Sequence, residues 1–195
     1  SYTTQYFLSV ATPHGDAGGN TGWYAKDHSV SLNTPRTVEV SQGVRDVFDG
    51  WVVSNSESKD YSLNIILRSP TEAKANYHKE YYLQLVSPYG KPSGSGWYRE
   101  GSTAVISAER DLPLPGLMGG LGAKNVFKGW SGDKTSSSNT ADVLMDSPKT
   151  VTANWTADYT LPYLIILLIT VLIITIPLLA QKKTISNPRR TGDRD

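Results

Sequence analysis

The stretch LPYLIILLITVLIITIPLLA, residues 161–180, contains twenty consecutive residues without a charged side chain. At about 1.5 Å per residue, a helix of this length spans about 30 Å, which is the thickness of the hydrocarbon core of a bilayer. A core helix of a soluble protein keeps a polar face, and this stretch has none. Because a helix satisfies its own backbone hydrogen bonds in lipid, the stretch predicts one transmembrane helix.

The residues on either side define the predicted span as 159–181 and orient it. Trp155, Tyr159 and Tyr163 stand at its start, where aromatic side chains suit the membrane interface. The tail from residue 181 carries five basic and two acidic residues, so its +3 leaves −2 for the rest of a chain with net charge +1. The positive-inside rule therefore predicts a basic cytoplasmic tail over 182–195 and an external N-terminal part.

The expected membrane anchor consists of apolar positions along the span, its two prolines and the lysines at its exit. These residues are Leu161, Pro162, Tyr163, Leu167, Leu172, Ile176, Pro177, Lys182 and Lys183. Pro162 suits a first helical turn, and Pro177 either kinks the helix or marks its last turn. Thr170 and Thr175 are expected to bond carbonyls of their own helix rather than a neighbouring helix. The span contains no ionisable residue that would form a proton relay.

Outside this span the chain is polar and rich in glycine, serine, threonine and tyrosine. It has no cysteine, which excludes disulfides, zinc–thiolate sites, iron–sulfur clusters and cysteine nucleophiles. A net charge of +1 provides no basic field for nucleic acid. An external domain must be exported, so we expect that Ser1 either follows a removed signal peptide or lies within a longer precursor.

The external part contains one sequence pattern twice. YFLSVATPHG begins at Tyr6 and YYLQLVSPYG at Tyr81, and the later segments GWY and F-x-G-W recur in the same order. The offset drifts only from 74, for Gly22 and Gly96, to 79, for Phe48 and Phe127. The pattern predicts two tandem β repeat units, residues 1–79 and 80–158.

Period-two alternation predicts four or five short strands in each unit. We expect them at 29–33, 47–52, 62–67 and 72–77 in the first unit, and at 82–86, 103–107, 126–130 and 150–155 in the second. The recurring tryptophans, Trp23, Trp51, Trp97 and Trp130, are expected in the cores, ahead of the alternative that they form a carbohydrate-stacking platform. The predicted fold class is an all-β ectodomain of two small β-sheet units plus one transmembrane α-helix.

A family resemblance rests on three segments of the second unit. The runs YYLQLVSPYGKPSGSGWYREGSTAVIS at 81–107, VFKGWSGD at 126–133 and MDSPKTVTANW at 145–155 resemble the divergent surface-repeat domains of archaeal and bacterial cell-envelope proteins. Those domains are distantly similar to internalin-type B repeats. The first unit departs from the pattern, because Val52-Val53 stands where the second unit has Ser131-Gly132. The resemblance implies a β-grasp type fold serving as a stalk, spacer or adhesion module, with no catalytic residues to carry over.

The remaining polar residues predict no catalytic, cofactor-binding or metal site. His14, His28 and His78 fall at unrelated places and are expected to be scattered on the surface. Asp133, with Asp142 and Asp146, lacks the spacing of a calcium loop and suits a solvated turn. The chain has no G-x-S-x-G nucleophile elbow.

Two further sites are candidates. Asn154, in Asn154-Trp155-Thr156, is a glycosylation candidate, with closeness to the membrane as the opposing consideration. The apolar segment 112–121 lies in the loop between Ile106 and Phe127, which is five residues longer than its counterpart between Leu32 and Phe48. Its side chains Leu114, Leu117, Met118 and Leu121 either contact lipid or a partner protein, or fold back to cap the core of their own unit.

These features predict a non-enzymatic, single-pass protein of the cell membrane that acts as a structural or interaction subunit of a membrane or envelope assembly. Its expected partners are the lipid bilayer and other membrane or envelope subunits, and not nucleic acid. Two alternatives stay open: the C-terminal stalk of a larger cell-surface adhesion protein, and a metal- or small-ligand-binding ectodomain.

Overall fold

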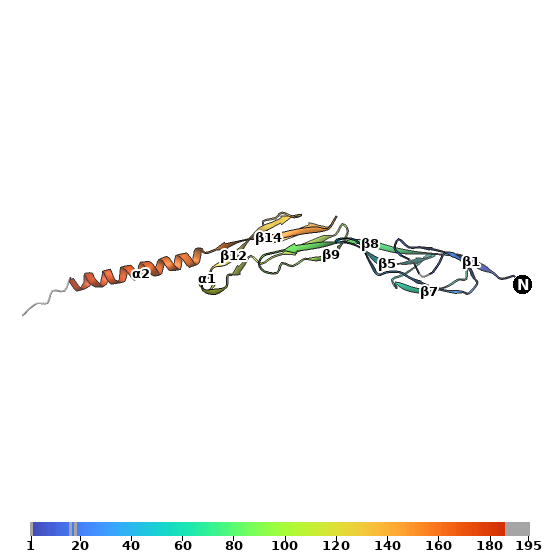
Figure 1. Ribbon diagram of the computed structural model, residues 1–195, viewed down its shortest axis with the longest axis horizontal. Coiled ribbons are helices and arrows are strands. Elements are labelled where there is room, and N and C mark those ends of the chain that lie inside the picture. The colour runs from blue at the N-terminus through green and yellow to red at the C-terminus, as the bar shows by residue number, and fades with distance from the viewer. Residues whose placement is uncertain (1, 16, 18, 186–195) are drawn as a thin grey trace, which may run out of the picture.

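A computed structural model describes residues 2–15, 17 and 19–185, with the backbone alone for 180–185. These residues form an elongated molecule in which two β units lie end to end and one long helix follows them (Figure 1). The described residues form a β-rich part up to Asp158 and one apolar C-terminal helix that is long enough to span a membrane, which confirms the predicted fold class.

The first unit is built from β1 (Gln5–Ala11), β2 (Gly22–Ala25), β3 (Ser29–Asn33), β4 (Thr37–Ser41), β5 (Val44–Val53), β6 (Ser56–Ser58), β7 (Ser62–Ile66) and the first half of β8 (Thr71–Val86). The second half of β8 begins the second unit, which continues with β9 (Gly96–Arg99), β10 (Thr103–Ser107), β11 (Asp111–Pro113), α1 (Gly116–Gly120), β12 (Lys124–Gly132), β13 (Thr140–Leu144) and β14 (Lys149–Asp158). The chain then enters α2 (Thr160–Ile185).

The predicted strands at 29–33 and 103–107 coincide with β3 and β10. The prediction of four or five strands per unit was too low, because each unit also has short strands. Four of these, β2, β6, β9 and β11, are only three or four residues long, too short for alternation to be recognised in the sequence.

Strand β8 belongs to both units. Its first half pairs with β5 and, in parallel, with β1, while its second half pairs with β9 and, in parallel, with β14. The sequence predicted separate strands at 72–77 and 82–86, but the structure joins them through residues 78–81. All four of these linking residues pair with β5, and Glu80 and Tyr81 also pair with β9. The predicted boundary between residues 79 and 80 therefore lies inside a continuous strand.

The two units use the same strand pairing. In the first, β1 pairs with β2, β3 with β7, and β4 with β5; in the second, β8 pairs with β9, β10 with β13, and β11 with β12. Strand β5 has a bulge between Phe48 and Gly50, and β12 has one between Phe127 and Gly129. The turn between β4 and β5 thus corresponds to the longer loop between β11 and β12.

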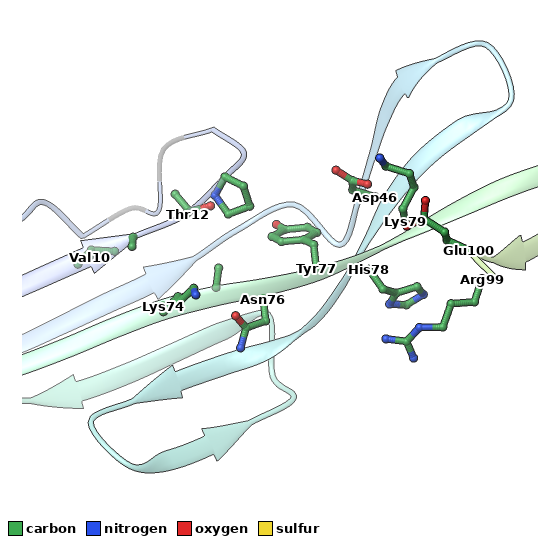
Figure 2. Close-up of a pocket in the computed structure, with 13 residues that line it drawn as sticks. Val10, Thr12, Asp46, Lys74, Asn76, Tyr77, His78, Lys79, Arg99 and Glu100 are labelled. Carbon is green, nitrogen blue, oxygen red and sulfur yellow. The ribbon is translucent and has the colours of Figure 1, made fainter. Parts of the chain in front are cut away.

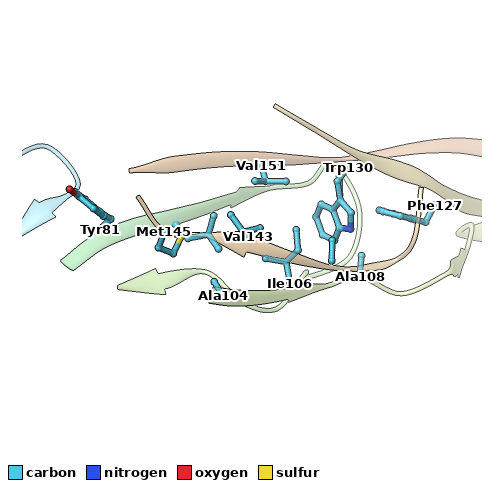
Figure 3. Packing of buried hydrophobic residues seen from close by; sticks show 12 residues of the cluster. Tyr81, Ala104, Ile106, Ala108, Phe127, Trp130, Val143, Met145 and Val151 are labelled. Carbon is cyan, nitrogen blue, oxygen red and sulfur yellow. The ribbon is translucent and has the colours of Figure 1, made fainter. Parts of the chain in front are cut away.

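Each unit has its own hydrophobic core. Leu8, Leu32 and Trp51 are among the buried residues of the first core, and Ile106, Trp130 and Val151 are among those of the second (Figure 3). The prediction that the other two repeated tryptophans are core residues was wrong. Trp23 is 66% exposed, and Trp97 is only partly buried. Successive strand residues face opposite sides, and the adjacent Tyr24 and Tyr98 are the ones packed against the two cores.

Candidate interaction surfaces

Charged side chains from three strands meet where the two units join. Arg45 of β5 lies 2.6 Å from Glu80 of β8. Asp49 of β5 contacts both His78 Nδ1, at 2.7 Å, and Arg99 of β9, at 3.1 Å. These contacts add side-chain links to the strand pairing across the junction.

An open groove of about 850 Å³ runs beside this junction (Figure 2). Its lining mixes charges of both signs, including Lys74, Lys79 and Arg99 with Asp46 and Glu100. Tyr81, next to the groove, donates a hydrogen bond to Glu100 at 2.8 Å, and this bond raises the pKa of Tyr81. The mixed lining provides no concentrated charge that would select one class of ionic ligand.

The histidines make contacts that the sequence did not predict. His14 Nε2 lies 2.7 Å from Asp46, and His78 lies against Asp49, so both are paired with carboxylates of β5. His28 instead stacks on Tyr24, with ring centroids 5.3 Å apart. Within the described part of the chain, no three acidic or histidine side chains are grouped to hold a metal ion.

The turn between β4 and β5 is seated on the second unit. A Cβ on Gly43 would lie 3.1 Å from the Cβ of Pro148 and 3.7 Å from that of Tyr82. Gly43 also accepts a backbone hydrogen bond from Tyr82 at 2.9 Å. A few ångströms away, the Arg45 guanidinium lies 4.3 Å above the ring of Trp97, which in turn packs on Tyr82. We call this surface of the second unit the inner seat: it consists of Tyr82, Trp97 and Pro148, and it contacts Gly43 and Arg45 of the first unit.

The first unit has the same seat at its outer end. Phe7 and Trp23 pack edge to face with centroids 5.3 Å apart, and the corresponding pair, Tyr82 and Trp97, does so at 5.2 Å. We call Phe7 and Trp23 the outer aromatic pair. Pro70, which corresponds to Pro148, is exposed beside the strand that pairs with β1. Trp23 is 66% exposed. The outer seat is therefore open to solvent, whereas the corresponding surface of the second unit contacts the first unit.

At the opposite end, helix α2 starts directly against the second unit. Asp158 accepts the backbone N–H of Thr160 at 2.9 Å, and its hydrogen bonds to Thr160 lower the pKa of Asp158. A Cβ on Gly122 would lie 2.6 Å from Leu161, so the loop before β12 touches the first turn of the helix. Pro162 is fully buried at the start of the helix, and Trp155, which is partly buried, packs on Phe127 in β12.

The described anchor residues of α2, apart from the buried Pro162, are exposed to the surroundings of the helix. Leu161, Tyr163, Leu167, Leu172 and Ile176 are all exposed, as a lipid-facing helix requires. Pro177 lies inside the helix, which continues to Ile185. Thr170 and Thr175 donate to carbonyls of the preceding turn at 2.8 and 2.9 Å, which confirms that prediction. The side chains of Lys182 and Lys183, and residues 186–195 of the tail, lie outside the described residues.

The apolar loop, defined here as residues 112–123, projects beside the start of α2 (Figure 1). Its short helix α1 has no buried residue, and Leu117 and Met118 are 77% and 39% exposed. Leu114 and Leu121 are half-buried at the base of the loop. The two side chains at the tip therefore do not cap the core of the second unit.

The other singled-out polar residues have local structural contacts. Asn154 is exposed on β14, and its amide donates to Ser131 at 2.9 Å. Its glycosylation stays a prediction. Asp133 accepts the backbone N–H of Thr150 at 2.6 Å, which suits the predicted turn.

One comparison with known proteins gives a match. The model of a divergent InlB B-repeat domain matches residues 125–159, which is less than a fifth of the chain and runs from β12 to the start of α2. The match supports a B-repeat-like surface domain in the second unit. No curated protein and no solved structure matches the chain.

Proposed function

We propose that this protein is a non-enzymatic, membrane-anchored surface protein that acts as a structural or interaction subunit of a membrane or cell-envelope assembly. In this role the two β units form a stiff spacer. Helix α2 holds one end at the bilayer, and the outer end carries the contact with the rest of the assembly. The continuous strand β8 supports the spacer role, because residues 78–81 leave no unpaired linker between the units.

The observation that carries the interaction role is the uncovered outer aromatic pair. In the second unit, Arg45 of the neighbouring unit lies over Trp97, which is partly buried, whereas Trp23 is 66% exposed; the ring partners Phe7 and Tyr82 are equally exposed, at 37%. Exposed aromatic side chains beside a proline are typical of surfaces that bind protein partners. The partner that best fits Phe7 and Trp23 is therefore another β unit that presents a glycine turn and an arginine.

A mild-detergent extract of the native membrane tests this function. We expect the protein to run as part of a large complex, and Trp23→Ala to release it as a smaller species. Ile66→Ala is the matched control, since Ile66 is a 54% exposed apolar residue of the same unit on β7, which pairs with β3 and not with the strands that carry Phe7 and Trp23. A wild-type protein that runs as a monodisperse monomer would contradict the subunit role.

The shared strand favours a second candidate, the C-terminal stalk of a larger surface protein. β8 is at once the last strand of the first unit and the first strand of the second, and β1 holds the corresponding first position. A preceding unit can therefore run into β1 in the same way. Peptide mapping of the mature protein distinguishes the two candidates, because the stalk requires peptides that precede Ser1.

A further inference from the structure

We infer that the apolar loop is a second membrane contact, inserted into the lipid interface beside helix α2. The inference rests on the proposed membrane anchoring and adds a named lipid-binding surface to it. It would give the ectodomain two points of attachment to the bilayer rather than one.

The position of the loop follows from the repeat. Strand β5 begins opposite Tyr81, at the end of the first unit that faces its neighbour. Strand β12 begins opposite Asp158, at the end of the second unit that faces the membrane helix. The hairpin turn before each strand therefore points at whatever follows its unit. For the first unit that is another β unit, and for the second it is α2.

The two turns touch their successors through corresponding glycines. Counting back from Phe48 and Phe127, Gly43 corresponds to Gly122, and both have positive φ, +71° and +93°. Gly43 abuts Tyr82 and Pro148, whereas Gly122 abuts Leu161 in the first turn of α2. The first turn therefore rests on the surface of the next β unit. The second turn, at the corresponding position, rests on the start of the membrane span.

The side chains of the two turns differ in polarity, as expected if the first turn faces a protein surface and the second faces the membrane. The first is the polar turn Ser41-Gln42-Gly43. The second is residues 112–123, LPLPGLMGGLGA, without a single charged or hydrogen-bonding side chain. Apolar side chains at the tip of a loop enter the boundary between headgroups and acyl chains favourably.

Polar groups mark where the insertion would stop. Lys124 and Asp111 form an ion pair of 2.8 Å across the base of the loop, and their hydrogen bond raises the pKa of Lys124. Tyr159 and Tyr163 lie close to each other, with centroids 6.1 Å apart, at the start of α2. Aromatic and charged residues of this kind prefer the headgroup level, which leaves Leu117 and Met118 to reach the acyl chains.

The absence of cysteine allows a site-specific test on the full chain. Leu117→Cys labelled with bimane is reconstituted into phosphatidylcholine vesicles, with or without bromine on the acyl chains near the headgroups. We expect a blue-shifted emission and about a twofold loss of intensity in brominated vesicles, because the label sits at the acyl boundary. The matched control is Gln42→Cys in the corresponding turn of the first unit, which should keep a water-like, unquenched emission.

A third labelled position separates this inference from the proposed anchoring. Leu167→Cys, inside the span, should be quenched whenever α2 crosses the bilayer. If Leu167→Cys is quenched and Leu117→Cys is not, the loop does not contact lipid and the inference fails while the anchor stands. A blue-shifted but unquenched label at Leu117 would also overturn it, because protein would then cover the loop. If neither position is quenched, both proposals fail.

Discussion

Trp51 and Trp130 occupy corresponding buried positions in the two units, but among the described residues only Trp51 has an acceptor for its indole N–H. Trp51 Nε1 donates to the carbonyl of Tyr61 at 3.4 Å, whereas Trp130 Nε1 is buried without a partner in the described part of the chain. A buried donor without an acceptor costs about 1–3 kcal/mol.

The first prediction compares the loss of the two indoles. Trp51→Phe and Trp130→Phe both remove volume from a core, but only Trp130→Phe also removes an unpaired donor. We expect Trp130→Phe to lower the free energy of unfolding by about 1 kcal/mol less than Trp51→Phe. Urea denaturation of both variants measures the difference, and equal or larger destabilisation by Trp130→Phe would contradict it.

The second prediction concerns the glycine of the repeated F-x-G-W segment. A Cβ on Gly129 would lie 2.7 Å from the carbonyl oxygen of Ser136, and one on Gly50 would lie 2.8 Å from that of Ser58. Gly129→Ala should therefore push the backbone at the β12 bulge away from that of Ser136 and lower the free energy of unfolding by about 1–3 kcal/mol. Thermal unfolding measures this cost. Gly22→Ala is the control, since no atom lies within 4 Å of a Cβ there and its effect should be small.

The third prediction tests the continuity of β8. Because residues 78–81 are paired, their amides should exchange with solvent as slowly as those in the middle of either unit. Lys79→Pro fixes φ and introduces a ring where β8 pairs with β5, and it should speed exchange across the junction and let the two cores unfold separately. Hydrogen exchange with mass spectrometry measures both effects. Lys79→Ala should leave exchange slow, and fast exchange in the unmodified chain would show a flexible linker instead.

The fourth prediction concerns Arg45. Its guanidinium contacts Glu80 at 2.6 Å and lies 4.3 Å from the centroid of the Trp97 ring, so it makes an ion pair and a cation–π contact at once. Lys keeps the charge but lacks the planar fork of donors of a guanidinium. Arg45→Lys should lower the free energy of unfolding by about 1 kcal/mol and raise the accessibility of Trp97 to acrylamide. Arg68→Lys, at an exposed pair with Asp27, is the control and should change neither. Unchanged quenching in Arg45→Lys would mean that the stacking does not cover Trp97.

The sequence predicted the features that depend on local pattern. Twenty uncharged residues suffice to predict α2, and alternation suffices for β3 and β10. It missed the continuity of β8, because the polar residues at 78–80 resemble a linker when their pairing with β5 is unknown. It also placed Trp23 in the core. Where both Trp23 and Tyr24 are aromatic, alternation shows that they face opposite sides but not which side is the interior.

The apolar loop was recognised from its composition, but its position was not. The repeat already gives its counterpart in the first unit, but only the pairing register shows that both turns lie at the same end of their units. Likewise, the outer aromatic pair can be interpreted as a contact surface only by comparison with Tyr82 and Trp97, because Arg45 lies over Trp97 in the structure.

The parallel pairing of β1 with β8, and of β8 with β14, also determines how the molecule bears tension. A pull between the outer end and the membrane draws β1 away from the bilayer while it draws β8 toward it, and the same opposition acts on β8 and β14. The force on each strand pair then acts parallel to the strands. The hydrogen bonds between the two strands therefore share the force and do not open one at a time. Under such a pull the two parallel strand pairs are sheared in series, and β8, which belongs to both pairs, carries the force from one unit to the other.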